Sequence, residues 1–281
     1  MAATPSIYEF EAIGTHWWLE RLDGGEFNSD IQHALEENTA EFDRRYSRFR
    51  EDSLIMQLAR DGQLDNPPAE MIAMLNYSKE LFEASEGAFN LSVGAALHKL
   101  GYGKQKHGGV VVAKFEDMVS WTDTEVIVPK GLVLDFGGFG KGWLIDKYVA
   151  ILRRHNVKQF IVNGGGDLYV QADEPVSFAL EHPYDPTLKI GDIRIQKGAL
   201  AASSTVKRVW KKGTDTMHHI IDPETGKPTD TGIVATFVCA HTALVADSLA
   251  TILVIRPDLE DSLKRQYNAE TLLLNRTNVI A

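Results

Sequence analysis

The segment LVLDFGGFGKGWLIDKYVAILRRH, residues 132–155, carries the pattern from which the fold of this chain can be developed. Its apolar start, residues 132–136, predicts a strand, and the glycines that follow predict a tight turn. Residues 142–155 have the spacing of a helix, and basic residues at its end suit the negative end of the helix dipole. We therefore expect a strand–turn–helix unit in which the glycine-rich turn lies at the N-terminus of the helix.

Helical and strand patterns continue on both sides of this unit. One helix is predicted to begin after Asn28 and Ser29, with apolar residues at helical spacing up to Tyr46, and a second to run from Pro67-Pro68 to Gly87. Further strands are predicted at residues 159–162, 177–180, 190–195, 208–211, 217–221 and 270–274, with a hairpin turn at Gly213 and an apolar helix at 242–255. Because helices and strands do not alternate strictly, these patterns predict an α+β fold.

Length and composition exclude several classes of protein. The 281 residues carry 39 acidic and 29 basic side chains, and this net charge of −10 makes nucleic acid an unlikely partner. No apolar run is long enough to cross a bilayer, so no membrane span is expected. Cys239 is the sole cysteine and is expected to be a packed thiol, which rules out an internal disulfide. With no signal peptide or lipid-anchor cysteine at its start, the sequence leads us to expect a cytoplasmic location.

Two glycine-rich loops could bind a phosphate. Residues 134–142 and 163–167 both allow close approach of the backbone to a ligand, and the first precedes a helix N-terminus. Neither loop is a Walker A motif or a dinucleotide fingerprint, since Asp135, Gly142, Trp143 and Tyr169 stand where those motifs need other residues. An anion site and a plain tight turn both remain open for each loop.

The pair Asp247 and Thr251 is a more specific feature. The two residues are four apart in the apolar helix 242–255, so they share one face of it. A carboxylate and a hydroxyl are hard oxygen ligands of the kind that Mg²⁺ accepts. The alternative is structural: a buried Asp247 could instead pair with an arginine or accept backbone N–H bonds.

Other candidate nucleophiles and ligands give weaker signals. His218 and His219 are adjacent at a predicted strand end, so they should face opposite ways and only one can serve a site. No zinc-binding spacing accompanies them. Ser203 and Ser204 lack the glycines of a nucleophile elbow, which argues against a serine hydrolase.

Taken together and in order, six segments resemble the ApbE family of FAD:protein FMN transferases. They are Ser47-Arg-Phe-Arg-Glu-Asp-Ser53, Gly87-Ala-Phe-Asn-Leu-Ser-Val-Gly94, Leu134-Asp-Phe-Gly-Gly-Phe-Gly-Lys-Gly142, Asn163-Gly-Gly-Gly-Asp167, His219-Ile-Ile-Asp-Pro223 and Ala246-Asp-Ser-Leu-Ala-Thr251. The resemblance implies one α+β domain over residues 1–281, with a flavin- and metal-binding cleft between two interleaved halves. It also implies a reaction that moves the FMN part of FAD to a Thr or Ser hydroxyl of a flavoprotein and releases AMP.

The resemblance also assigns roles to individual residues. Asp247 and Thr251 are expected to bind Mg²⁺, or Mn²⁺, together with a backbone oxygen near Gly138. The expected FAD contacts are Phe49, Lys99, Leu100, Gly101, Asp135 and Lys141. His219 is the candidate for proton handling, and Asp247 is the other expected catalytic residue. The acceptor is expected to carry an Asp-x-x-Ser/Thr-Gly-Ala-Thr pattern.

The sequence departs from the family pattern at several positions. Gly140 stands where alanine is common and Ala95 where proline is common, and Ala202-Ser-Ser-Thr205 replaces a segment that tends to Thr-Ser-Gly. The last change lies on a strand expected to border the cleft, so it could alter access of the acceptor. Two alternatives therefore stay open: an Mg²⁺-dependent FAD pyrophosphatase that gives FMN and AMP, and a non-catalytic FAD-binding protein.

Overall fold

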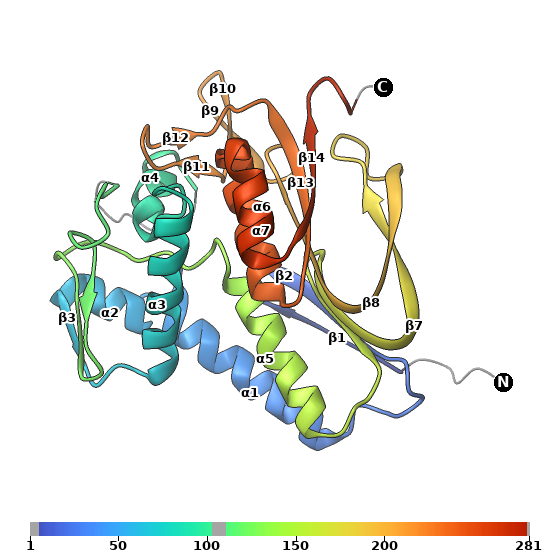
Figure 1. Cartoon of the computed structure of the whole chain (residues 1–281). Coiled ribbons are helices and arrows are strands. Elements are labelled where there is room, and N and C mark those ends of the chain that lie inside the picture. The colour runs from blue at the N-terminus through green and yellow to red at the C-terminus, as the bar shows by residue number, and fades with distance from the viewer. Residues whose placement is uncertain (1–5, 103–110, 280–281) are drawn as a thin grey trace.

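The fold is built on a seven-stranded antiparallel sheet with helices packed on one face (Figure 1). The computed structural model describes residues 6–102 and 111–279. The strands lie in the order β1-β2-β6-β7-β8-β13-β14. Their bounds are Ser6–Ala12, Thr15–Arg21, Phe160–Gly164, Asp167–Glu181, Lys189–Ser204, Ile233–Ala240 and Glu270–Asn275. Strands from both ends of the chain thus meet in one sheet, and the α+β class is confirmed.

Helices and small sheets surround this central sheet. The helices are α1 (Ser29–Tyr46), α2 (Leu54–Asp61), α3 (Ala69–Ala84), α4 (Gly94–Lys99), α5 (Gly140–Arg154), α6 (Ala243–Ile255) and α7 (Glu260–Tyr267). The strands of the small sheets are β3 (Gln63–Asp65), β4 (Ser120–Trp121), β5 (Glu125–Ile127), β9 (Val209–Lys212), β10 (Asp215–His218), β11 (Ile221–Asp222) and β12 (Lys227–Pro228). None of the described helices is both long and apolar enough to cross a membrane.

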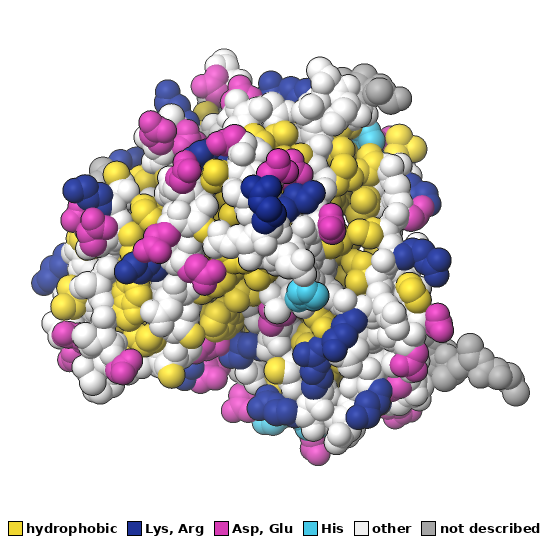
Figure 2. Space-filling view, in the orientation of Figure 1, with side chains coloured by type: hydrophobic (Ala, Val, Ile, Leu, Met, Phe, Trp, Pro, Cys, Tyr) yellow, Lys and Arg dark blue, Asp and Glu magenta, His cyan; other side chains and the backbone are white. Residues whose placement is uncertain are grey.

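The alternation of side chains along the strands creates two apolar cores. Tyr169 and Ala199 belong to the large core between the sheet and the helices. Their neighbours in sequence, Leu168 and Leu200, belong to a smaller core together with Phe237. On the face that Figure 2 shows, acidic and basic side chains are interspersed, and no continuous basic stripe of the kind that follows a nucleic acid crosses it.

Most of the elements expected from sequence are present. The helix after Asn28 is confirmed, and the Asn28 side chain caps it by accepting a hydrogen bond from the Ile31 N–H at 3.0 Å. The second helix ends just before Gly87, whose φ of +88° lies in the left-handed region. The helices expected at 142–155 and 242–255 and the strands expected at 159–162, 177–180, 190–195, 208–211 and 270–274 are confirmed within two residues or as parts of longer strands. Gly213 forms the predicted turn, between β9 and β10.

Two predictions from sequence are wrong. Residues 132–136 form no strand: the four apolar residues are buried in the large core, and the Asp135 N–H donates to the Leu91 carbonyl at 2.8 Å. The run is apolar because it is buried between layers, and burial alone does not require a strand partner. Residues 217–221 are divided between β10 and β11, which belong to separate two-stranded sheets. The β1–β2 hairpin and the helices α2, α4 and α7 are among the elements that were not predicted.

Helices α5 and α6 cap each other where they cross. The Asp146 carboxylate of α5 accepts hydrogen bonds from the Ala243 and Leu244 N–H groups at 3.0 and 2.9 Å. In return, the Asp247 carboxylate of α6 accepts one from the Gly142 N–H at 2.9 Å. Each helix thereby satisfies free N–H groups at the start of the other. The crossing fixes the glycine-rich turn of α5 against the predicted ligand face of α6.

The close approach of the two helices requires glycine at position 142. A Cβ atom added to Gly142 lies 2.3 Å from the Ala243 carbonyl oxygen, which belongs to the backbone and cannot rotate away. A Cβ atom added to Gly140, in the same helical turn, meets only the Phe42 ring at 3.7 Å, an ordinary contact. Gly140 therefore provides a control position for a substitution at Gly142.

We predict that Gly142→Ala lowers the free energy of unfolding by about 2 kcal/mol or more, because overpacking must separate the two helices. Gly140→Ala should be neutral or slightly stabilising, since alanine favours a helix. Urea denaturation of both variants measures the difference. Equal stability of the two variants would show that the helix crossing tolerates a side chain at 142.

Candidate active site

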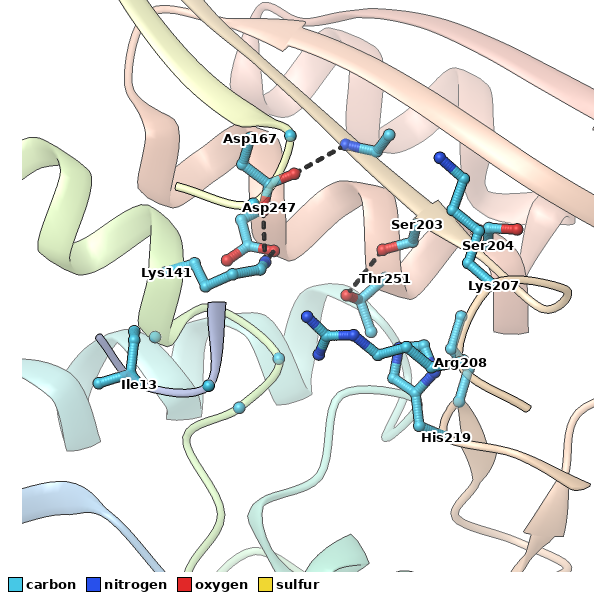
Figure 3. A pocket seen from close by; sticks show the side chains of 18 of the residues that line it. Ile13, Lys141, Asp167, Ser203, Ser204, Lys207, Arg208, His219, Asp247 and Thr251 are labelled. Carbon is cyan, nitrogen blue, oxygen red and sulfur yellow. Dashed lines mark hydrogen bonds and ion pairs between the residues drawn. The ribbon is translucent and has the colours of Figure 1, made fainter. Parts of the chain in front are cut away.

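One cavity brings together most of the residues that the sequence singled out. Its volume is about 960 Å³, and its walls come from the N-terminal hairpin, the glycine-rich turn, β7, β8, α6 and the segment around His219 (Figure 3). Seven of the ten predicted site residues line it: Phe49, Asp135, Gly138, Lys141, His219, Asp247 and Thr251. The size and the mixed lining suit a small-molecule ligand.

The polar centre of the cavity is one lysine shared by two carboxylates. Lys141, from the start of α5, pairs with Asp247 at 3.0 Å and with Asp167, the first residue of β7. Both carboxylates are almost fully buried, with side chains 3% exposed. The second oxygen of Asp167 accepts a hydrogen bond from the Ala202 N–H of β8 at 3.0 Å. This arrangement connects four elements of the cavity wall, α5, α6, β7 and β8.

The charges at this centre do not balance. Burial alone would lower the pKa of Lys141, but the two carboxylates outweigh that effect and hold it well above its usual range. Burial raises the pKa of Asp247, and the Asp167 charge adds to this effect although Lys141 opposes it. Two carboxylates and one ammonium leave an excess of negative charge in a buried place. The centre therefore favours an additional cation.

Asp247 and Thr251 provide oxygen atoms one helical turn apart on α6. The Thr251 hydroxyl lies 3.2 Å from the Ser203 hydroxyl of β8, and both residues line the cavity. Both Asp247 oxygens already accept hydrogen bonds, one from Lys141 and one from the Gly142 N–H. These contacts are of the kind expected if Asp247 has a structural role, with a lysine in place of the expected arginine. No group of three or more His, Cys, Asp or Glu side chains in the described chain could hold a metal. A bound Mg²⁺ would need hydroxyl, backbone and substrate oxygens as well.

Asp135 shapes the glycine-rich turn. One carboxylate oxygen pairs with the Arg48 guanidinium at 2.8 Å, and the other accepts a hydrogen bond from the Gly137 N–H at 2.8 Å. Gly138 packs so closely that an added Cβ would lie 2.9 Å from the Phe89 ring. The turn therefore presents its backbone, rather than side chains, to the cavity.

His218 and His219 face opposite ways, as their adjacency in an extended segment predicts. The His218 ring contacts the Thr229 carbonyl oxygen at 3.0 Å. His219 lines the cavity, and its buried Nδ1 has no hydrogen-bond partner among the described residues. Burial, followed by the nearby Arg208 charge, lowers the pKa of His219 to about 4. The neutral ring is thus available to accept a proton.

The predicted contacts at residues 99–101 are not brought to the cavity. The carbonyl oxygens of Lys99 and Leu100 accept hydrogen bonds from Lys212 and from the Trp210 indole, both at 2.8 Å, so this segment holds β9 against the end of α4. Gly101 follows with a φ of +91°. None of the three is among the described lining residues.

Tyr102 reaches the cavity instead, beside Phe49. The Tyr102 and Phe49 rings lie 6.4 Å apart, and the Arg48 guanidinium stands 4.2 Å from the Phe49 ring centroid. Phe49 is 49% exposed, so it forms part of the open rim. Among the lining side chains that sequence reasoning did not assign to the site are Arg48, Tyr102, Asp167 and Arg208, whereas Ser203 lies on the strand that was expected to border the cleft. Arg48 and Asp167 belong to two of the six segments, which was a usable signal.

Comparisons with known proteins match most of the chain. The sequence model of the ApbE family matches residues 13–271. An FAD:protein FMN transferase of Klebsiella pneumoniae (strain 342) is 22% identical to this chain over an alignment of 297 positions, which covers 97% of this chain and 85% of that protein. A related transferase of Vibrio cholerae (strain O395) is 26% identical over 255 residues, which cover 83% of this chain and 74% of that protein.

Solved structures agree in fold. The ApbE protein of Thermotoga maritima superposes with a TM-score of 0.85 at 20% identity, covering 98% of this chain and 95% of that one. The flavin transferase ApbE of Vibrio cholerae superposes with a TM-score of 0.81 at 20% identity, covering 98% and 94% of the two chains. These likenesses confirm the expected fold.

We predict that His219 stays neutral down to about pH 4 in the free protein, because burial and Arg208 disfavour its charged form. Since its pKa lies below the value of about 6.5 in an unfolded chain, this residue's contribution to stability is complete above pH 6.5 and decreases toward pH 4. NMR titration of the histidine rings tests this, with His219→Asn and His218→Asn to assign the signals. A His219 signal that titrates near pH 6.5 would contradict it.

Proposed function

The chain belongs to the ApbE family, and on that basis we propose that it is an FAD:protein FMN transferase. The proposed reaction breaks the pyrophosphate bond of FAD and forms a phosphoester between FMN and a Thr or Ser hydroxyl of a flavoprotein. AMP leaves with the electron pair of the broken bond, and the hydroxyl proton passes to a base. One observation carries the proposal: the carboxylate–hydroxyl pair of α6, the glycine-rich turn and the His219 ring, whose Nδ1 has no hydrogen-bond partner among the described residues, all line a single cavity.

We propose that Mg²⁺, or Mn²⁺, is the cofactor. Asp247, Thr251 and a backbone oxygen near Gly138 would hold it, and the excess negative charge around Lys141 supports a cation at this place. When bound, the metal ion neutralises charge on the pyrophosphate oxygens. Lys141 must then exchange part of its contact with Asp247 for the substrate, a shift that its remaining partner Asp167 permits.

Other residues of the cavity are proposed to bind FAD and to accept the proton. The backbone of the glycine-rich turn and Lys141 bind pyrophosphate oxygens, since N–H groups at a helix start and an ammonium both favour anions. Asp135 keeps that turn in shape, and Phe49 offers a ring at the rim for the flavin or adenine. His219 accepts the proton of the attacking hydroxyl. Residues 99–101 do not line the cavity, so the proposed contacts of this segment with FAD require that it moves toward FAD when FAD binds.

The acceptor is proposed to be a flavoprotein segment with the pattern Asp-x-x-Ser/Thr-Gly-Ala-Thr. Residues 1–281 act in this proposal as one unit, because the cavity takes lining residues from Ile13 to Ile255. A cytoplasmic acceptor is the simplest counterpart of the cytoplasmic location expected from sequence. The exposed residue Ala202 and the Ser203 hydroxyl would form the wall where the acceptor enters.

We predict that an acceptor peptide or flavoprotein with this pattern gains the mass of FMN minus water when it is incubated with the protein, FAD and Mg²⁺. Positioning the hydroxyl in line with the phosphorus is worth several kcal/mol, so transfer should exceed hydrolysis. Mass spectrometry measures the product, and an acceptor with Ala at the Ser/Thr position is the control. If AMP and free FMN are released at the same rate with and without the acceptor, and the acceptor gains no FMN, the pyrophosphatase alternative is favoured. If the protein binds FAD but does not turn it over, the non-catalytic alternative is favoured.

We predict that activity requires Mg²⁺ or Mn²⁺ and that Asp247→Asn reduces it by roughly 100-fold or more, since the charge of the carboxylate ligand is lost. Thr251→Val should reduce it as well, whereas Thr251→Ser, which keeps the oxygen, should retain most of it. Turnover with and without EDTA, and at a series of Mg²⁺ concentrations, provides the measurement. Undiminished turnover after metal removal would exclude the metal role.

A further inference from the structure

The basic side chains of the cavity are paired with carboxylates, with one exception. Five Lys and Arg residues line it, namely Arg48, Arg50, Lys141, Lys207 and Arg208. Arg48 pairs with Asp135 at 2.8 Å, Arg50 with Asp43 at 3.1 Å, Lys207 with Glu181 at 2.7 Å, and Lys141 with Asp167 and Asp247. Arg208 forms no ion pair with any carboxylate in residues 6–102 or 111–279. Its guanidinium is therefore the one cationic group of this lining that remains available for an anion.

The backbone around Arg208 is held in place. Arg208 follows β8, where the Thr205 N–H and the Ser204 hydroxyl both donate to the Val234 carbonyl oxygen, at 3.1 and 3.0 Å. The Val206 N–H donates in turn to the Ser204 hydroxyl at 3.2 Å. Figure 3 shows the Arg208 side chain extending from this loop into the cavity, beside the His219 ring. The guanidinium thus enters the cavity from a fixed base.

Two unbalanced charges therefore occupy different walls of one cavity. Excess negative charge lies at Asp167 and Asp247, around the start of α5, and an unpaired positive charge lies at Arg208, on the loop that follows β8. A ligand that carries a phosphate, with a divalent cation on its other side, would balance both. A guanidinium suits that phosphate because its planar fork donates two parallel hydrogen bonds to non-bridging oxygens.

We propose that Arg208 binds the phosphoryl group that is transferred, the FMN phosphate of FAD. This inference rests on the proposed function. The position beside His219 selects this phosphate over that of AMP, because the base that takes the proton of the attacking hydroxyl must lie next to the attacked phosphorus. Arg208 then stabilises the negative charge on the oxygens of that phosphorus as the acceptor oxygen bonds to it and the bond to AMP breaks.

Arg208→Ala tests the assignment through binding as well as activity. Calorimetry with FMN, AMP and riboflavin, each with Mg²⁺, should show FMN affinity reduced roughly 10- to 100-fold, while the affinities for AMP and riboflavin stay within about twofold. The rate of FMN transfer should fall by at least the same factor. Added guanidinium at millimolar concentration should restore part of the rate of Arg208→Ala, because it can occupy the vacated place.

Two further variants keep the test specific. Lys211→Ala removes an exposed positive charge three residues away, outside the described lining, and should change neither binding nor rate. Arg208→Lys keeps the positive charge but loses the planar guanidinium. Its FMN affinity and its rate of FMN transfer should therefore lie between those of the wild type and of Arg208→Ala. Thermal unfolding of each variant shows that it folds, as expected for exposed positions.

The outcomes separate this inference from the proposed function. If the wild-type protein transfers FMN, and Arg208→Ala has the same FMN affinity and the same transfer rate as the wild type, then Arg208 does not bind this phosphate and the inference is wrong. A loss of AMP affinity in place of FMN affinity would also overturn it, because Arg208 would then contact the leaving group. If the wild-type protein neither binds nor cleaves FAD, the proposed function fails first, and this inference with it.

Discussion

Helices α5 and α6 start against each other, and the candidate site depends on that contact. The absence of a side chain at Gly142 allows the Ala243 carbonyl to approach, and Asp146 and Asp247 then satisfy N–H groups across the crossing. Because Lys141 precedes Gly142 and Asp247 lies one turn into α6, the same contact places both charged groups in one cavity. The sheet supports this crossing from behind, and the strands β7 and β8 add Asp167 and Ser203 to it.

The cavity keeps charges that a purely structural core would avoid. A buried carboxylate without full compensation costs several kcal/mol, whereas the exposed Arg208 guanidinium stays hydrated and lacks only a partner. Elsewhere along the walls the protein pairs its charges closely, as at Arg48 and Lys207. The two imbalances are therefore local and opposite in sign. Such departures from good packing and pairing are typical of sites at which a ligand completes the balance.

Local sequence patterns predicted what depends on local structure. Caps and glycines marked the helices, and the spacing of Asp247 and Thr251 placed them on one face of α6. The error at residues 132–136 arose because an apolar run reports burial and not pairing. Arg208 escaped notice because a missing partner is a property of the assembled cavity. Residues 99–101 were carried over from the family, and in this structure their backbone serves the contact with β9.

Mutual capping of α5 and α6 also links their motions. Opening the first turn of either helix breaks hydrogen bonds of the other, because Asp146 and Asp247 each reach across the crossing. Both starts should therefore fray as one cooperative unit, visible as a shared rate of amide hydrogen exchange for Gly142, Ala243 and Leu244. Any ligand that draws these starts together then slows exchange at all three amides at once, and it does so before any bond in the ligand is broken.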